Sequence, residues 1–289
     1  MKLGVYINKN KKNLESILNI ILEEFSSKND EIIYLNEENF ISNLMNSPIS
    51  RKKEKIDYDI LITIGGDGTI LSAIRSEYEK EKPILGIHAG KLGFLAEADI
   101  ENCKEVLESI KKSDFKIESR SLFEIQLSND KKKKYICANE IVIDRGRSAR
   151  TMKANVYENE MLVNRYEGDG LIISTANGST AYSLSAGGPI IYPSLDLLTI
   201  TPICSHSLST RTIVLNGNSN ITINFPDKKS SRTLTIDGQV DFKIKDNMEI
   251  NISTSKKKIH FLLTKESNYF NKLRNKMGWF NSIDDKNNY

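Results

Sequence analysis

The stretch Ile60-Leu61-Ile62-Thr63-Ile64-Gly65-Gly66-Asp67-Gly68-Thr69 decides the fold class of this chain and suggests where a ligand binds. Its apolar run is typical of a buried strand, and the run ends in a turn with three glycines and one carboxylate. Glycines let a bulky anion approach the main chain closely. Because ligands bind at the carboxyl ends of strands in open α/β sheets, we expect a phosphate site that contains Asp67. The alternative is a tight strand-to-helix turn with Asp67 as a cap.

Strand and helix patterns alternate around this stretch in the first hundred residues. Strands are predicted at residues 3–7, 31–35, 58–64 and 83–87, and amphipathic helices at 14–25, 70–78 and 106–110. Strands that alternate with helices indicate a parallel, doubly wound sheet. We therefore expect an α/β nucleotide-binding domain of the Rossmann-like type over residues 1–114.

From residue 115 onward the apolar residues follow a strand period instead. Short strands are predicted at 115–118, 123–127, 135–143, 154–157, 171–174, 197–203, 221–225, 233–236, 248–252 and 259–263. Many short strands separated by Asn, Gly, Ser and Asp indicate an antiparallel β domain, expected as a sandwich over residues 115–264. Residues 265–289 are expected to form a terminal helix and tail, with Phe270 and Leu273 on the helix.

Composition excludes several classes of function. The chain of 289 residues carries 41 basic and 38 acidic residues, a net charge of +3, which gives no general argument for nucleic-acid or membrane binding. Three cysteines far apart in sequence argue against a disulfide framework and a zinc site, and suit a reducing compartment. The N-terminus reads as a short strand rather than a signal segment, and no stretch is long and apolar enough to span a bilayer. We expect a cytoplasmic protein with no metal-ligating cluster.

A second glycine-rich segment, residues 168–189, contains five glycines and many hydroxyl groups. Ser179 is placed to cap a short helix through Ser183, and the free N–H groups of that helix suit a phosphate or ribose oxygen. Tyr182 offers a ring for stacking. The alternative is a Gly/Ser-rich crossover within a β domain.

Several motifs occur in the order found in the NAD kinase family, and the chain resembles that family over most of its length. The motifs are Gly65-Gly66-Asp67-Gly68-Thr69, Gly90-Lys91-Leu92-Gly93-Phe94-Leu95, Asn139-Glu140, Asp169 to Thr175, Gly178 to Ser183, Pro202 to Leu208 and Asp237-Gly238-Gln239. The glycine turn alone also resembles those of diacylglycerol kinases, sphingosine kinases and phosphofructokinases. The chain departs from the family at Ala176 and Asn177, where relatives usually have Pro and Thr, and at Ser205, where they often have Pro. We expect the loop to keep its shape, since Asn tolerates turn conformations.

The resemblance implies that the protein transfers the γ-phosphoryl group of ATP, with Mg²⁺, to the 2′-hydroxyl of the adenosine ribose of NAD. It implies Asp67 as the acid that accepts the hydroxyl proton, with Gly68 keeping the backbone open. Phe94 is expected either to close over the adenine or to pack in the core, and Arg150 either to contact the ligand or to be solvated. The remaining residues expected to bind the dinucleotide are Asn139, Glu140, Glu167, Asp169, Thr180, Ala181, Tyr182, Ser183, Leu184, Ser185 and Gln239.

The resemblance also implies a homodimer or homotetramer, with the terminal helix returning to the first domain. Two other functions are considered. A lipid kinase of the diacylglycerol or sphingosine type shares the turn and the two-domain layout, but nothing here resembles a membrane-docking face. A catalytically silent NADP-binding module on the same fold is expected to lack the acid, whereas Asp67 is present.

Overall fold

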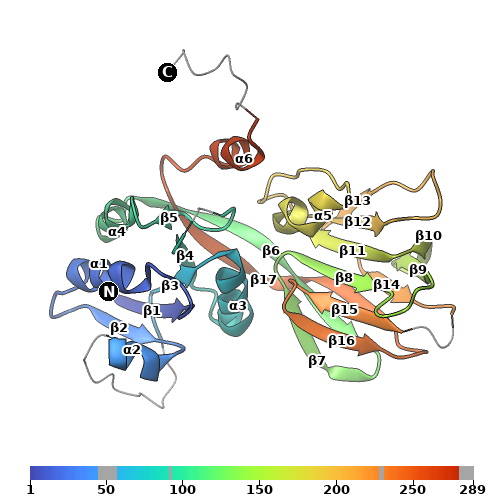
Figure 1. Ribbon diagram of the computed structural model, residues 1–289, viewed down its shortest axis with the longest axis horizontal. Coiled ribbons are helices and arrows are strands. Elements are labelled where there is room, and N and C mark those ends of the chain that lie inside the picture. The colour runs from blue at the N-terminus through green and yellow to red at the C-terminus, as the bar shows by residue number, and fades with distance from the viewer. Residues whose placement is uncertain (45–56, 91–92, 228–230, 280–289) are drawn as a thin grey trace. The chain divides into compact units, whose positions relative to one another are not determined.

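The computed structural model describes residues 1–44, 57–90, 93–227 and 231–279, which form two compact units (Figure 1). The α/β unit is drawn from Met1–Ala73, Lys82–Glu118 and His260–Tyr289, and the β unit from Ile74–Glu81 and Ser119–Ile259. These limits lie a few residues from the predicted boundaries at 114/115 and 264/265. Residues 74–81 also belong to the β unit, and no sequence pattern predicted this. Lys91, Leu92 and residues 280–289 of the predicted motifs and tail lie outside the described residues.

The α/β unit contains a parallel sheet. Its strands are β1 (Lys2–Ile7), β2 (Glu31–Tyr34), β3 (Ile60–Gly65), β4 (Pro83–His88) and the short β5 (Ala98–Asp99), together with the end of β17 (Ile250–Thr264). The order β2-β1-β3-β4 is parallel throughout, and β17 pairs with β4 in parallel at His260 and Phe261. Its helices are α1 (Leu14–Glu24), α2 (Glu38–Leu44), α3 (Asp67–Glu77), the 3₁₀ turn η1 (Tyr78–Lys80), α4 (Cys103–Lys111) and α6 (Tyr269–Met277), although η1 and the end of α3 are counted with the β unit.

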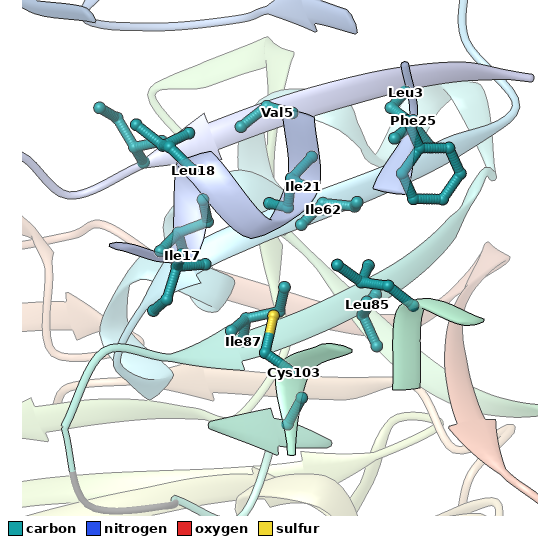
Figure 2. Packing of buried hydrophobic residues seen from close by; sticks show 14 of the residues in the cluster. Leu3, Val5, Ile17, Leu18, Ile21, Phe25, Ile62, Leu85, Ile87 and Cys103 are labelled. Carbon is teal, nitrogen blue, oxygen red and sulfur yellow. The ribbon is translucent and has the colours of Figure 1, made fainter. Parts of the chain in front are cut away.

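One apolar core lies between this sheet and helices α1 and α4 (Figure 2). Alternate residues of each strand point to the same face, so Leu85 and Ile87 of β4 meet this core. Gly86 between them faces the opposite side, where a Cβ would come within 2.6 Å of Ile70 on α3. Helices therefore pack on both faces of the sheet, as a doubly wound arrangement requires. Each fully buried Leu or Ile contributes about 1.5–3 kcal/mol to folding.

The β unit is an antiparallel sandwich. One sheet has the order β13-β12-β11-β8-β15-β16, from β8 (Glu140–Asp144), β11 (Gly170–Thr175), β12 (Leu197–Ile203), β13 (Ile213–Asn216), β15 (Arg232–Ile236) and β16 (Val240–Ile244). The other contains β10-β9-β14-β17 and the pair β6-β7, from β6 (Phe115–Leu127), β7 (Asp130–Cys137), β9 (Met152–Glu158), β10 (Met161–Gly168) and β14 (Ile221–Asn224). Apolar side chains of both sheets form one buried core. The predicted fold class, an α/β domain plus an antiparallel β-sandwich, is confirmed.

Some predicted elements differ from those observed. The two strands expected at 115–118 and 123–127 are one strand, β6, and those expected at 248–252 and 259–263 are one strand, β17. Polar residues interrupt the apolar pattern in both strands, and the two strands pair with each other. Helix α2 and strands β10, β13 and β16 were not predicted, although Val240, Phe242 and Ile244 of β16 alternate with polar residues as in a half-buried strand.

The terminal helix α6 is bound to the α/β unit through one buried carboxylate, Glu97. Its oxygens accept hydrogen bonds from the N–H (2.9 Å) and hydroxyl (2.8 Å) of Thr264, the hydroxyl of Ser267 (2.8 Å) and the ammonium of Lys272 on α6 (2.6 Å). The side chains of Lys272 and Glu97 are only 14% and 4% exposed. The same ammonium also donates to the carbonyl of Ala96 at 2.9 Å, so Glu97 anchors both α6 and the segment that leads into it.

Replacing Glu97 with Ala is expected to destabilise the protein by about 3 kcal/mol, because a nearly buried ammonium loses its carboxylate. Urea unfolding followed by circular dichroism measures the change. The control is Lys112→Met, which removes a 3.6 Å ion pair to Glu108 between side chains that are 73% and 44% exposed, and which should change stability little. Equal effects of the two substitutions would contradict the assignment.

Candidate functional site

Asp67 is the first residue of α3 and turns its carboxylate toward the segment that precedes β5. The carboxylate accepts hydrogen bonds from the main-chain N–H of Phe94 (2.9 Å) and Leu95 (3.3 Å). A helix cap instead bonds N–H groups two or three residues later in its own helix, so the capping alternative does not describe this carboxylate. A Cβ on Gly93 would lie only 2.0 Å from Oδ1 of Asp67. Glycine at position 93 is thus required for this contact.

The glycine turn itself is partly open to solvent. Gly68 is exposed, while Gly66 and Asp67 are half-buried. A Cβ on Gly66 would lie 3.3 Å from Nε2 of His88 and 3.9 Å from Nζ of Lys11, so both side chains are adjacent to this backbone. Main-chain N–H groups with an ammonium and an imidazole beside an open turn suit a phosphate. Phe94 is half-buried and is not among the buried core residues.

Asn139 and Glu140 lie where β7 ends and β8 begins. Strand β8 pairs with both β11 and β15, so Glu140 is the first residue of an interior strand. The Asn139 carbonyl accepts from the N–H of Thr175 (2.9 Å), and the Thr175 hydroxyl donates to the Ala138 carbonyl (2.7 Å). Asn139 and Glu140 are both buried, with exposed fractions of 8% and 6%. A buried polar pair of this kind needs defined partners.

The side chain of Asn139 is held by Asn177, one of the two departures from the family pattern. Nδ2 of Asn177 donates to Oδ1 of Asn139 at 2.6 Å, and Oδ1 of Asn177 accepts from the guanidinium of buried Arg120 at 2.5 Å. An arginine only donates, so this contact sets the orientation of both amides. The expectation that the loop keeps its shape has a physical basis here, although no sequence pattern predicted Arg120.

The carboxyl group of Glu140 has a strongly raised pKa. Burial, with a smaller contribution from the charge of Asp237, raises the pKa of its carboxyl from the usual 4.5 to about 8. Its Oε2 is buried and has no hydrogen-bond partner among the described residues. A carboxyl in this state is a frequent mark of a functional site.

Asp237, the first residue of the Asp-Gly-Gln turn, was missed as a site residue. It accepts from the N–H of Ala138 (3.1 Å) and of Asn139 (2.7 Å), and from the guanidinium of Arg75 on α3 (3.0 Å). Gln239 lies in the turn between β15 and β16, and its side-chain carbonyl accepts from the same arginine. The spacing of Asp237 and Gln239 was visible in the sequence, but a partner such as Arg75 was not.

The second glycine-rich segment forms the 3₁₀ turn η2 (Asn177–Thr180) and the short helix α5 (Tyr182–Ser185). The prediction that Ser179 caps a helix is wrong. Ser179 is fully buried, and its hydroxyl bonds both the N–H (3.1 Å) and the carbonyl (3.2 Å) of Ile191. The N-cap position of α5 is Ala181, with no side-chain cap. A Cβ on Gly178 would lie 2.3 Å from the Asn139 carbonyl oxygen, so glycine allows the segment to pack directly on Asn139.

Asp169 and Tyr182 line one pocket of about 520 Å³ within the β unit. Arg145, which donates to Asp169 at 2.9 Å, and Ser148 line it as well. Asp169 and Tyr182, both predicted to bind the ligand, thus lie in the same pocket. It does not bring Arg150 into the lining of this pocket: Arg150 is exposed.

The other predicted residues of the β unit differ in accessibility. Glu167 is exposed and contacts Lys153 (3.6 Å) and Thr151 (3.3 Å). Thr180, Ala181 and Leu184 are half-buried, and Ser185 is exposed. Ser183 differs from the prediction, because it is fully buried and shares a 3.1 Å hydrogen bond with Thr201. Its role is therefore to hold α5 against β12 rather than to face a ligand.

Within residues 1–44, 57–90, 93–227 and 231–279, no group of three or more His, Cys, Asp or Glu side chains is arranged to hold a metal ion. No helix in the same described residues is long and apolar enough to cross a membrane.

Comparison with known proteins relates both halves of the chain to one family. Residues 8–115 match the ATP-NAD kinase N-terminal domain, and residues 138–264 match the ATP-NAD kinase C-terminal domain. An NAD kinase of Clostridium botulinum (strain Kyoto / Type A2) is 40% identical over 282 residues, 96% of either chain. An NAD kinase of Sulfurimonas denitrificans is 34% identical over 279 residues, covering 96% of this chain and 97% of the relative.

Solved structures agree with this relationship. Yeast NADH kinase, in a crystal structure with NADH, superposes with a TM-score of 0.85 at 26% identity, covering 98% of this chain and 88% of the yeast chain. An NAD kinase from Archaeoglobus fulgidus, in complex with ATP, has a TM-score of 0.72 at 24% identity, covering 96% of this chain and 99% of the other, and supports the fold.

Replacing Glu140 with Gln is expected to flatten the pH dependence of stability. The folded-state pKa is raised, so the native protein binds the proton more tightly than the unfolded chain, and stability falls as the pH rises from about 4.5 to about 8. The part of that fall due to Glu140 is on the order of 3 kcal/mol between pH 5 and 8. Urea unfolding at pH 5, 6.5 and 8 measures it. Parallel curves for the wild type and the variant would refute the raised pKa.

Proposed function

This chain belongs to the ATP-NAD kinase family, so its activity is the ATP-dependent phosphorylation of NAD, and we propose that Asp67 is its catalytic acid-base residue. The γ-phosphoryl group of ATP passes to the 2′-hydroxyl of the adenosine ribose, giving NADP and ADP. The observation that supports the role of Asp67 is its half-buried carboxylate, oriented by two main-chain N–H groups at the open end of a parallel strand.

Asp67 accepts the proton of the 2′-hydroxyl as that oxygen bonds to the γ-phosphorus and the bond from phosphorus to the β,γ-bridging oxygen breaks. The leaving electron pair stays on ADP. Such a transfer depends on alignment and charge neutralisation rather than on a covalent intermediate. The contacts from Phe94 and Leu95 serve the alignment, because they hold the carboxylate in one orientation.

The dinucleotide is proposed to bind through the β unit. Asn139 and Glu140 contact the adenosine part. The accessible residues of the following segment cover it, chiefly Tyr182 together with Thr180, Ala181, Leu184 and Ser185. Asp169, in the same pocket as Tyr182, and the exposed Glu167 and Arg150 are proposed to contact the remaining dinucleotide. Gly68, Phe94 and Gln239 complete the proposed set. Support comes from the buried, partnered amide of Asn139 and from the unpartnered Oε2 of Glu140.

Mg²⁺ is proposed to enter bound to the triphosphate. The described residues offer single carboxylates such as Asp67 rather than a metal-ligating cluster, which fits an ion held mainly by phosphate oxygens and water. When bound, Mg²⁺ neutralises charge on the phosphates. We also propose a homodimer or homotetramer in the cytoplasm, on family membership alone.

A lipid kinase and a silent NADP-binding module are less well supported. The glycine turn is common to lipid kinases, but the buried Asn139–Glu140 pair and its hydrogen-bonded supports fit a compact polar ligand rather than a lipid. A silent module has no need of an oriented, solvent-accessible Asp67.

The activity is tested by incubating the purified protein with ATP, Mg²⁺ and NAD and detecting NADP with an NADP-specific dehydrogenase. Asp67→Asn is expected to reduce kcat by at least about 100-fold while the affinity for NAD stays within a few-fold, because general-base catalysis contributes about 10²–10⁴. Isothermal calorimetry provides the affinity. A wild-type protein that phosphorylates diacylglycerol or sphingosine and not NAD would overturn the function, and an unfolded Asp67→Asn variant would make Asp67 structural.

Gly93→Ala is expected to reduce kcat by at least about tenfold, because its methyl group would occupy the position of the Asp67 carboxylate, 2.0 Å from Oδ1. Gly90→Ala is the matched control, since a Cβ there is 3.4 Å from the nearest atom, in His88. Kinetics and thermal unfolding of both variants are compared. Equal activity of the two alanine variants would contradict the proposed need for glycine beside the Asp67 carboxylate.

A further inference from the structure

The main chain at Ala138 and Asn139 leaves the β ladders just before the dinucleotide-binding pair. Strand β7 ends at Cys137 and β8 begins at Glu140, so the N–H groups of residues 138 and 139 need other acceptors. Both donate to one carboxylate, that of Asp237, at 3.1 and 2.7 Å. The thiol of Cys137 donates to the same carboxylate at 3.2 Å. Three successive residues are therefore anchored to a single anion.

The position of Asp237 is set by its backbone. Its φ of +50° lies in the left-handed region, which Asp and Asn tolerate better than most residues. Its side chain is fully buried, and its N–H donates to the Glu140 carbonyl at 2.9 Å, continuing the β8–β15 pairing. The sheet contacts on this side are thus complete without the carboxylate, which is left to serve residues 137–139.

Arg75 supplies the positive charge that a buried carboxylate requires. One end of its guanidinium donates to Asp237 at 3.0 Å and another to the side-chain carbonyl of Gln239. The two contacts form a fork on both polar residues of the Asp-Gly-Gln turn, a geometry that lysine cannot reproduce. The Arg75 side chain is only 16% exposed.

We propose that Arg75 and Asp237 are positioning residues that fix the main chain at Ala138–Asn139 and thereby orient Asn139 and Glu140 for the adenosine part of NAD. The inference rests on the proposed role of that pair in NAD binding. Neither positioning residue needs to touch the substrate. Their effect is transmitted through main-chain N–H groups immediately before the residues that bind it.

Three variants test the proposal. Asp237→Asn keeps the shape of the side chain, and Asn tolerates the positive φ. The variant has one neutral amide oxygen in place of the carboxylate, and its NH₂ group would face the N–H and S–H donors of residues 137–139. Arg75→Met removes the fork, and Arg75→Lys retains one charged contact. Steady-state kinetics with NAD varied at saturating ATP, and with ATP varied at saturating NAD, are combined with calorimetric titration of NAD.

Lys257→Met is the matched control. It removes an ammonium that lies 2.6 Å from the carboxylate of Glu79, in the 3₁₀ turn that follows α3. The Lys257 side chain is 32% exposed. It should leave both Michaelis constants within about twofold of the wild-type values.

The expected result is a rise of at least about tenfold in the KM and Kd for NAD in Asp237→Asn and Arg75→Met, with the KM for ATP within about twofold. Arg75→Lys should give an intermediate rise. The proposal is overturned if both Michaelis constants rise together, if neither changes, or if all three variants fail to fold, since the pair would then be structural. A wild-type protein without NAD phosphorylation would instead overturn the proposed function.

Discussion

A single buried anion, the carboxylate of Asp237, holds the main chain just before Asn139 and Glu140, the pair proposed to bind the dinucleotide. An unpaired charge in a protein interior is costly, so the surrounding chain must supply donors. Here the donors are two main-chain N–H groups, a thiol and the guanidinium of Arg75. The break between β7 and β8, which would otherwise leave polar groups unsatisfied, becomes a defined loop because this acceptor is present.

In the α/β unit, the carboxylate of Asp67 is likewise held by main-chain N–H groups. There the carboxylate is half-buried, and two main-chain N–H groups hold it in place without a charged partner among the contacts described above. The contact depends on the absence of a side chain at Gly93. The two acids thus differ in accessibility: Asp67 is half-buried and open to solvent, as its proposed catalytic role requires, whereas Asp237 is enclosed by the groups that it binds.

Much of this was predictable from local patterns. The strand before the glycine turn and the helices packed on β3 and β4 follow from apolar periodicity. The strand predicted at 135–143 is instead divided into β7 and β8, and Glu140 is the first residue of β8. Long strands such as β17 were not predictable, because their polar residues resemble loop residues until pairing satisfies them. The role of Ser179 was also mistaken, since a hydroxyl near a helix start looks the same in sequence whether it caps that helix or bonds Ile191.

The fold class and the glycine turn with its acid follow from the sequence alone, and so does the presence of a polar pair, Asn139–Glu140, within an apolar run. These depend on the periodicity and chemistry of neighbouring residues. Only the tertiary structure decided which distant side chains complete the site: Arg75 with Asp237, and Arg120 with Asn177 beside Asn139. Such contacts join residues separated by tens to more than a hundred positions. No local pattern specifies them, because a buried charge is satisfied by whichever donors the packed chain brings to it.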